Sequence, residues 1–441
     1  MSVTTHPVYI DGLAGPTYTF LGLGIGNTAS LAHKGEPSNP QKTALQGLYK
    51  MKQLADLGIK QALLPPQERP DIATLRLLGF MGTDAEVLAR AAKEAPELLW
   101  ACSASSALWT ANGATISPSS STADGRVHIT PANLATLFHR SLEPIHTALA
   151  LQCLLPFPES FVHHDPLPSH HTLGDEGAAN TLTLCASYDG PQITLFVYGK
   201  EGRAFSTARQ SLEASQSIAR LHRLSHTLFA KQSPPLVERG VFHNDLVATA
   251  HKNTLLYYQD AWVDTPKLLA QLSDQLEGLG TPLTALEITQ KELPLEDLLD
   301  SYLLNSQLLP LPSGELLLAA STKARDNPRS KAVIDRLLAE SNPIKQVLYF
   351  DLSESLKNGG GPACVTLPCL LTESELGDSH DSLFMNDTGY AALVDWVKAH
   401  YRDRLTRDDL GDPALLLETR QALDDLTVLL DLGPIYPFQM G

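Results

Sequence analysis

One cysteine in the last quarter of the chain lies in a setting suited to nucleophilic chemistry. In the segment 358–364, Asn358 is followed by three glycines, Pro362, Ala363 and Cys364. Glycines let the backbone adopt positive φ and approach a ligand closely, and Pro362 fixes the chain just before the thiol. A flexible linker followed by a core cysteine would show the same pattern, because free cysteine is among the most often buried residues. The segment therefore makes Cys364 a candidate nucleophile and leaves a structural role open.

Two other segments carry groups that act as acids and bases. The segment 241–247 is strand-like, and the alternation of a strand would put His243 and Asp245 on the same face. In the segment 174–180, Asp175 and Glu176 lie between glycines. A buried polar group without a partner costs on the order of a few kcal/mol, so these groups need partners. A satisfied core pair and an exposed turn are the structural alternatives, and convergence with Cys364 is a hypothesis.

The elements that must position these residues alternate between strands and helices. Strands are predicted at 346–352 and 365–371 around the glycine turn, and a hairpin at 181–185 and 193–197 around Asp189 and Gly190. Helices are predicted from Pro40 to Gly58, after a capping box of Thr83 and Glu86, and over 293–309, 328–338, 389–401 and 413–432. The stretches 117–125 and 163–171 are predicted surface loops. With no clear linker, the pattern favours α/β structure in one large domain, residues 1–441.

Composition excludes several classes of protein. A net charge of −16 over 441 residues argues against nucleic-acid binding, which needs clustered Lys and Arg. No apolar run approaches the ~18 residues that a membrane span needs. The start, Met1 to His6, has no export signal, and five cysteines without CxxC spacing are typical of reduced thiols in the cytoplasm. We predict core positions for the four other cysteines, which are Cys102, Cys153, Cys185 and Cys369.

Two patterns suggest cofactors that we do not predict. The residues from Gly24 to Ala29 fit the loose G-x-G-x-x-A form of a dinucleotide loop, but no helix is expected before about Asn39. The histidines between His163 and His171 suggest zinc, but Pro166 and Pro168 interrupt them and the spacing is irregular. We therefore expect no metal and no organic cofactor.

Taken in order, these segments resemble the N-succinylarginine dihydrolase family of the guanidine-modifying pentein superfamily. The resemblance runs over nearly the whole chain and includes the segments 11–17, 38–40, 64–70, 109–112, 138–141, 174–180, 242–245, 358–364 and 436–439. It implies a pentein five-bladed α/β propeller of pseudo-fivefold ββαβ repeats with the site at its centre. It also implies hydrolysis of N2-succinyl-L-arginine with two waters to N2-succinyl-L-ornithine, two ammonia and CO2, in a cytoplasmic homodimer of arginine catabolism. A single-round deiminase and a non-catalytic pentein-type binding protein are the alternatives.

The resemblance also assigns roles to individual residues. Cys364 matches the nucleophile, His243 the acid and base, and Glu176 the third catalytic residue, which would orient His243 or the substrate. Asp245 matches a guanidinium-binding position. The other substrate-binding positions are Asn112, His139, Arg140, Arg209, Asn358 and the loop of Leu21, Gly22, Leu23, Gly24, Ile25, Gly26, Asn27, Thr28, Ala29 and Ser30. Members of the family often carry Ser-Phe where this chain has Gly24 and Ile25, so a side-chain hydroxyl contact at position 24 is not expected.

Overall fold

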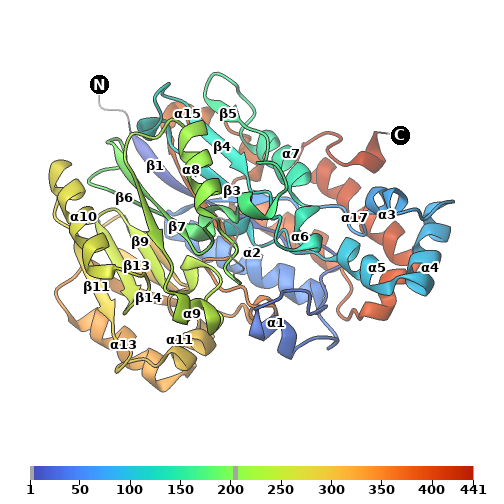
Figure 1. The fold of residues 1–441 in the computed structure, drawn as a ribbon. Coiled ribbons are helices and arrows are strands. Elements are labelled where there is room, and N and C mark those ends of the chain that lie inside the picture. Colours follow the sequence, from blue (N-terminus) through green and yellow to red (C-terminus); the bar gives the residue numbers. More distant parts are fainter. Residues whose placement is uncertain (1–3, 202–206, 441) are drawn as a thin grey trace.

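Five three-stranded sheets form the body of the molecule in a computed structural model that describes residues 4–201 and 207–440 (Figure 1). In each sheet a central strand pairs antiparallel with one neighbour and parallel with the other. A helix follows the central strand and leads to the third strand, as a parallel connection requires. These are ββαβ units, and they confirm the predicted five-bladed α/β propeller.

The sheets follow one another along the chain. The first strands of neighbouring sheets contact each other, β6 with β9 and β9 with β12, so these strands lie innermost. Two of the units consist of β3 (Ala114–Ser117), β4 (Val127–Pro131), α7 (Pro144–Leu154) and β5 (Phe161–His163), and of β6 (Thr181–Cys185), β7 (Gln192–Tyr198), α8 (Leu212–Leu221) and β8 (Thr227–Lys231). The next two consist of β9 (Ala248–His251), β10 (Thr254–Tyr258), α10 (Thr265–Gly278) and β11 (Thr284–Ile288), and of β12 (Gln307–Pro310), β13 (Leu316–Ser321), α13 (Pro328–Ala339) and β14 (Ile344–Phe350).

The fifth unit joins two distant parts of the chain. It consists of β15 (Thr366–Thr372), β1 (Thr5–Gly12), α2 (Pro40–Asp56) and β2 (Lys60–Leu64). Strand β1 pairs antiparallel with β15, from Thr5 opposite Thr372 to Asp11 opposite Thr366. A buried ion pair holds this unit together: Lys50 Nζ of α2 lies 2.7 Å from Asp11 Oδ2 of β1 and donates to Thr366 Oγ1 of β15 at 2.8 Å.

A smaller helical layer packs beside the sheets, at the right in Figure 1. It contains α3 (Ile72–Leu77), α4 (Asp84–Glu94), α5 (Pro96–Ser103), α6 (Phe138–Ser141) and α17 (Pro413–Leu429). Its core is separate from that of the sheets and includes Leu75, Leu88, Leu99, Cys102 and Leu416. The remaining helices are α1 (Thr28–Ala32), α9 (Pro234–Glu238), α11 (Leu295–Ser301), α12 (Thr322–Asp326), α14 (Ser353–Lys357), α15 (Glu373–Gly377) and α16 (Asp387–His400).

Most strongly patterned elements are confirmed. Helices α2, α13, α16 and α17 lie where they are predicted, α4 begins with the capping box of Thr83 and Glu86, and β6 and β7 form the hairpin. The strands around the glycine turn are β14 and β15, with α14 between β14 and the turn. The stretches 117–125 and 163–171, which are predicted surface loops, each begin with the last residue of a strand, β3 and β5. Among the described residues no helix is both long and apolar enough to cross a membrane. The prediction of no export signal rests on residues 1–6, and residues 1–3 lie outside the described part of the chain.

Three local predictions are wrong. The stretch 293–309 is not one helix, because Tyr302 adopts a left-handed φ of 54° after α11, and Leu308 and Leu309 belong to strand β12. The segment 241–247 is not a strand: residues Asn244–Leu246 form a 3₁₀ turn, anchored where the indole N–H of Trp262 donates to Asn244 Oδ1. A helix does begin before residue 39, since Asn27 caps the short helix α1.

Candidate active site

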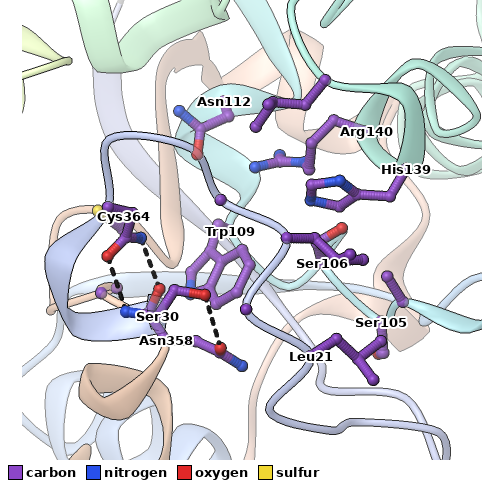
Figure 2. Close-up of a pocket in the computed structure, with 18 of the residues that line it drawn as sticks. Leu21, Ser30, Ser105, Ser106, Trp109, Asn112, His139, Arg140, Asn358 and Cys364 are labelled. Carbon is purple, nitrogen blue, oxygen red and sulfur yellow. Dashed lines mark hydrogen bonds between the residues drawn. The ribbon is translucent and has the colours of Figure 1, made fainter. Parts of the chain in front are cut away.

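A cavity with about 650 Å³ of empty space, counted out to the open solvent, lies among loops and helices that surround the glycine turn (Figure 2). Separate parts of the chain meet around it: the loop after β1, the segment after α5, helix α6, and the glycine turn. The cavity is lined by Tyr18, Thr19, Leu21, Gly22, Leu23, Gly24, Asn27, Ser30, Ala104, Ser105, Ser106, Trp109, Asn112, Leu137, His139, Arg140, Arg209, Phe242, His243, Asn358, Gly359, Gly360 and Cys364.

The thiol of Cys364 is buried at the base of this cavity. Its S–H donates to Asp245 Oδ2 at 3.3 Å, and Asn305 Nδ2 donates to the sulfur at 3.1 Å. Burial, together with the charge of Asp245, raises the pKa of Cys364 well above its ordinary value. Both effects favour the thiol over the thiolate, and positive charge placed beside the sulfur would favour the thiolate.

The glycine turn has to be made of glycine because the side chain of Trp109 packs against it. A Cβ on Gly360 would lie 2.0 Å from Trp109 Nε1, well inside van der Waals contact. The indole N–H donates to Ser355 Oγ at 3.1 Å, and Ser355 Oγ donates to the carbonyl of Gly360 at 2.7 Å. These contacts hold the turn against the cavity floor.

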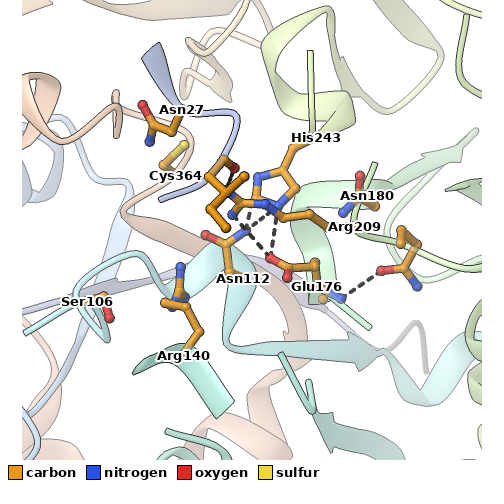
Figure 3. Close-up of polar contacts among 12 residues, drawn as sticks. Asn27, Ser106, Asn112, Arg140, Glu176, Asn180, Arg209, His243 and Cys364 are labelled. Atoms are coloured by element: carbon orange, nitrogen blue, oxygen red, sulfur yellow. Dashed lines mark hydrogen bonds and ion pairs between the residues drawn. The ribbon is translucent and has the colours of Figure 1, made fainter. Parts of the chain in front are cut away.

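His243 faces the cavity with a carboxylate behind it (Figure 3). Its Nε2 lies 2.9 Å from Oε2 of Glu176, a side chain with 0% exposure that does not line the cavity. With Nε2–H donating to Glu176, Nδ1 carries the lone pair, 3.4 Å from Asn112 Nδ2. Burial alone would raise the pKa of Glu176, but the hydrogen bond from His243 and the charge of Arg209 lower it to about 2. Glu176 therefore stays ionised and contacts His243.

Arg209 lies close to this pair. Its Nη1 is 3.8 Å from Glu176 Oε2, its Nη2 donates to the carbonyl of Ile25 at 3.4 Å, and its guanidinium lies 4.3 Å from the ring centroid of Phe242. The loop therefore reaches the site through a backbone carbonyl at position 25, while the Ile25 side chain is 72% exposed. Arg209 is thus placed to influence both the His243–Glu176 pair and a bound anion.

Arg140 and His139 lie at another part of the wall. Arg140 Nε donates to Glu143 Oε1 at 2.9 Å, and its buried Nη2 has no partner among the described residues. Burial, together with the charges of Arg140 and Arg209, lowers the pKa of His139 to about 3. The pair therefore presents one positive charge with a spare N–H donor, together with a neutral imidazole.

The structure brings most of the predicted site residues together. Around the cavity lie Leu21, Gly22, Leu23, Gly24, Asn27, Ser30, Asn112, His139, Arg140, Arg209, His243, Asn358 and Cys364. The remaining predicted site residues do not line the cavity; they are Ile25, Gly26, Thr28, Ala29, Glu176 and Asp245. Asp245 instead lines a second cavity and contacts the Cys364 thiol at the edge of the first.

Several residues at or near the cavity are not identified as site residues from the sequence. Trp109, Phe242, Gly359 and Gly360 fall inside segments that carry the family resemblance, which is the pattern that could have found them. Ser105, Ser106 and Asn305 have no such mark, because each stands in an ordinary apolar or small-residue stretch. Only the fold brings them to the cavity or to the thiol.

The residues whose sequence patterns suggest a metal or a dinucleotide make other contacts in the structure. His164 Nε2 lies 3.0 Å from His128 Nδ1, His163 Nε2 lies 2.8 Å from the carbonyl of Leu155, and the ring of His170 lies tilted at 46° against that of His171. No group of three or more His, Cys, Asp or Glu in residues 4–201 and 207–440 is arranged to hold a metal ion. Although α1 begins inside the G-x-G-x-x-A pattern, β1 ends at Gly12, so the strand–turn–helix context of a dinucleotide loop is missing.

Comparison with known proteins identifies the relatives of this chain. A family model described as succinylarginine dihydrolase matches residues 4–439. An N-succinylarginine dihydrolase of Aeromonas hydrophila subsp. hydrophila is 48% identical over 441 residues, covering 98% of this chain and 99% of the relative. One from Shewanella baltica strain OS155 is 46% identical over 438 residues, covering 97% and 98%. Among solved structures, the binary complex of a cysteine-to-alanine mutant of AgrE with L-arginine has a TM-score of 0.51 at 15% identity, over 83% of this chain and 40% of that one, a likeness of fold.

Proposed function

The chain belongs to the succinylarginine dihydrolase family, and we propose that it hydrolyses N2-succinyl-L-arginine with two waters to N2-succinyl-L-ornithine, two ammonia and CO2 in arginine catabolism. The observation that carries this proposal is the grouping at one cavity of a buried thiol, a histidine with its own carboxylate, and an arginine with an unpaired N–H. Nucleophile, proton carrier and carboxylate receptor are the groups that this reaction needs.

The substrate fits the charges around the cavity. Succinylarginine carries a guanidinium at one end and two carboxylates at the other, and the cavity lining offers a buried thiol as well as the arginines Arg140 and Arg209. Arg140, whose Nη2 is free of protein partners among the described residues, would bind a carboxylate through a charge-assisted hydrogen bond. The guanidinium would then point toward Cys364, with Asp245 beyond the thiol.

Binding of the cation supplies the charge that the thiol lacks. Burial and the Asp245 carboxylate keep Cys364 protonated, and a guanidinium placed beside it offsets both effects. The thiol proton passes to His243 Nδ1, and the resulting imidazolium is stabilised by the ionised Glu176. The substrate therefore generates its own nucleophile in the proposed reaction.

Each proposed round has two stages. In the first, the Cys364 thiolate forms a C–S bond to the guanidinium carbon, and the C–N bond to a terminal nitrogen breaks as His243 donates the proton that completes ammonia. In the second, His243 takes a proton from water, the hydroxide adds to the thiouronium carbon, and the C–S bond breaks to release a ureido product. A second round at the ureido carbon releases another ammonia, and the remaining carbamate loses CO2.

Incubation with succinylarginine tests the proposal directly. We expect two ammonia for each succinylornithine, quantified together with the product mass. One ammonia with an accumulating ureido product would identify a single-round deiminase. Absence of ammonia with retained binding would identify a non-catalytic binding protein.

The organisation of the protein is part of the proposal. We propose one catalytic domain over residues 1–441, a cytoplasmic location, and a homodimer that binds neither nucleic acid nor membrane. The five cysteines are all unpaired, which supports a reducing compartment. The homodimer rests on the family resemblance, and light scattering of the purified protein at twice the chain mass would support it.

A further inference from the structure

Asn305 lies in the connection between α11 and β12 and touches the sulfur of Cys364. Its side chain is 0% exposed, and its Nδ2 lies 3.1 Å from Cys364 Sγ and 3.3 Å from the carbonyl oxygen of Asp245. On the other side of the amide, Oδ1 accepts the backbone N–H of Cys364 at 3.4 Å. The backbone carbonyl of Asn305 accepts from Ala363 N at 3.0 Å. One asparagine therefore contacts the nucleophile and the chain that carries it.

These contacts fix which way the amide faces. Because Oδ1 accepts from a backbone N–H, the NH₂ group must point toward the sulfur. Its two N–H groups have two acceptors, the sulfur and the Asp245 carbonyl. Both bonds are buried, so water does not compete for them.

We propose that Asn305 is a further catalytic residue, whose amide donates a hydrogen bond that stabilises the thiolate of Cys364 more than the thiol. A sulfur anion is a stronger acceptor than a neutral thiol, so a fixed N–H donor favours ionisation. The amide has no proton to give up at neutral pH, so it stabilises charge without acting as an acid. The inference rests on the proposed function in taking Cys364 as the nucleophile.

The surroundings of the sulfur make this donor important. Burial and the Asp245 carboxylate raise the pKa of Cys364, and the hydrogen bond from Asn305 lowers it. The hydrogen bond from Asn305 carries no net charge and is present before substrate binds. It opposes burial and the Asp245 carboxylate, which both favour the protonated thiol. The guanidinium of the substrate and the amide of Asn305 would then act together on the same charge.

The third glycine of the turn is explained by the same contact. A Cβ on Gly361 would lie 2.5 Å from Asn305 Oδ1, so any larger residue there would displace the amide. The glycine turn and Asn305 are thus one arrangement, built from two parts of the chain that meet at Cys364.

The pH dependence of alkylation at Cys364 tests the proposal without any turnover. Wild type and Asn305→Ala are treated with iodoacetamide from pH 6 to 10, and the label is quantified on the peptide that contains Cys364. We expect the whole curve of rate against pH to move upward by about one pH unit or more in Asn305→Ala, so that its rate at pH 8 falls about 3- to 10-fold below that of wild type. The matched control is Ser306→Ala, which removes an adjacent buried hydroxyl with no partner among the described residues and should leave the profile unchanged.

Steady-state kinetics add a second readout. Asn305→Ala should lower kcat about 10- to 100-fold with a change in KM below about 3-fold, because Asn305 does not line the substrate cavity. An unchanged alkylation profile in folded Asn305→Ala overturns the proposal. Circular dichroism reports whether the variant folds.

Gly361→Ala decides the question if Asn305→Ala does not fold, since it keeps the asparagine but displaces its amide. The same upward shift is expected, and a wild-type profile counts against the proposal. Loss of folding in both variants would make Asn305 a structural residue and also overturn it. If wild type is alkylated at Cys364 but releases no ammonia from succinylarginine, the proposed function fails while the alkylation profile still decides the role of Asn305.

Discussion

Glu176 and His243 are 67 residues apart in the sequence, and their side chains meet at 2.9 Å between Oε2 and Nε2. The carboxylate lies behind the ring and does not line the cavity, and its Oε2 contacts His243 and, more distantly, Arg209. A buried anion in this position fixes the tautomer of the ring, and in the proposed mechanism it would stabilise the imidazolium formed at His243.

Replacing Glu176 tests this relationship. Glu176→Gln keeps the shape and can still accept a hydrogen bond, but it removes the charge, so we expect kcat to fall at least about 100-fold with little change in KM. Asp175→Asn is the control, because Asp175 bonds to Gln210 and the backbone of Gly177 rather than to His243. Near-normal kcat in folded Glu176→Gln would refute the assigned role.

Cys364→Ser should abolish turnover while the protein stays folded. The hydroxyl is nearly isosteric with the thiol, but its pKa is far too high for a neighbouring cation to generate an alkoxide. Acid-quenched wild type should carry a substrate-derived mass on the peptide that contains Cys364, and the variant should not. Cys185→Ser, at another buried cysteine, should keep the adduct on Cys364; a label on a different cysteine would contradict the mechanism.

Arg140→Ala should raise KM for succinylarginine much more than it lowers kcat. Losing one charge-assisted bond to a substrate carboxylate costs about 1.5–3 kcal/mol, or roughly 10- to 150-fold in affinity. Arg126→Ala removes an arginine that pairs with Asp124 and does not line the cavity, so its kinetics should match wild type. An unchanged KM in Arg140→Ala would remove Arg140 from the carboxylate site.

Asp175 should give the protein a pH-dependent stability. Burial raises the pKa of Asp175 to about 6, although hydrogen bonds from Gln210 and Gly177 act in the opposite direction. The unfolded chain has the ordinary pKa of about 3.9, so the folded state holds this proton more tightly, and stability falls as pH rises from about 4 to 6.

Asp175→Asn removes that titration. Its free energy of unfolding relative to wild type should therefore rise by on the order of 2 kcal/mol between pH 4.5 and pH 7. Urea unfolding at the two pH values measures the difference, with Asp189→Asn in the exposed hairpin loop as control. A difference that does not change with pH would show that Asp175 does not titrate in this range.

Lys50→Met should strongly destabilise the fold. It leaves the buried Asp11 carboxylate without its cation, which costs about 3–5 kcal/mol. Adding Asp11→Asn removes the stranded charge and should restore much of the loss. Lys52→Met, in the exposed i,i+4 pair with Asp56, should change the free energy of unfolding little. Equal effects of the two lysine substitutions would contradict the role of the buried pair.

Local patterns in the sequence predict the elements that are stabilised by local contacts. The capping box of Thr83 and Glu86 and the proline at the start of α2 are short-range devices, and the helices that they begin lie where expected. Residues 241–247 have the apolar alternation of a strand, but Asn180 and Trp262 hold the 3₁₀ turn from far along the chain, so no local pattern reports it. The same holds for the end of α11, where pairing of β12 with β13 overrides a helical run of leucines.

The candidate site divides in a similar way. Cys364, His243 and Glu176 stand out because their residue types suit catalysis and their segments resemble a known family. The resemblance does not distinguish Glu176 as a partner of His243 from a ligand of the substrate, because that depends on which side of the ring the carboxylate lies. Asn305 is an unremarked asparagine after two leucines, and its contact with the sulfur exists only because β12 and the glycine turn are neighbours.

The pairing of β1 with β15 can form only after most of the protein has been synthesised. Strand β1 leaves the ribosome before its partner β15, which follows only after the other four sheets. Until then one edge of β1 is unpaired, and exposed edges of this kind are templates for aggregation, so the nascent chain depends on rapid closure. The glycine turn directly precedes β15, and the thiol of Cys364 therefore takes its place only as the ring closes. A ribosome-bound fragment that lacks β15 would hold His243 and Glu176 without a positioned nucleophile, so the reactive centre is complete only once β15 has paired with β1.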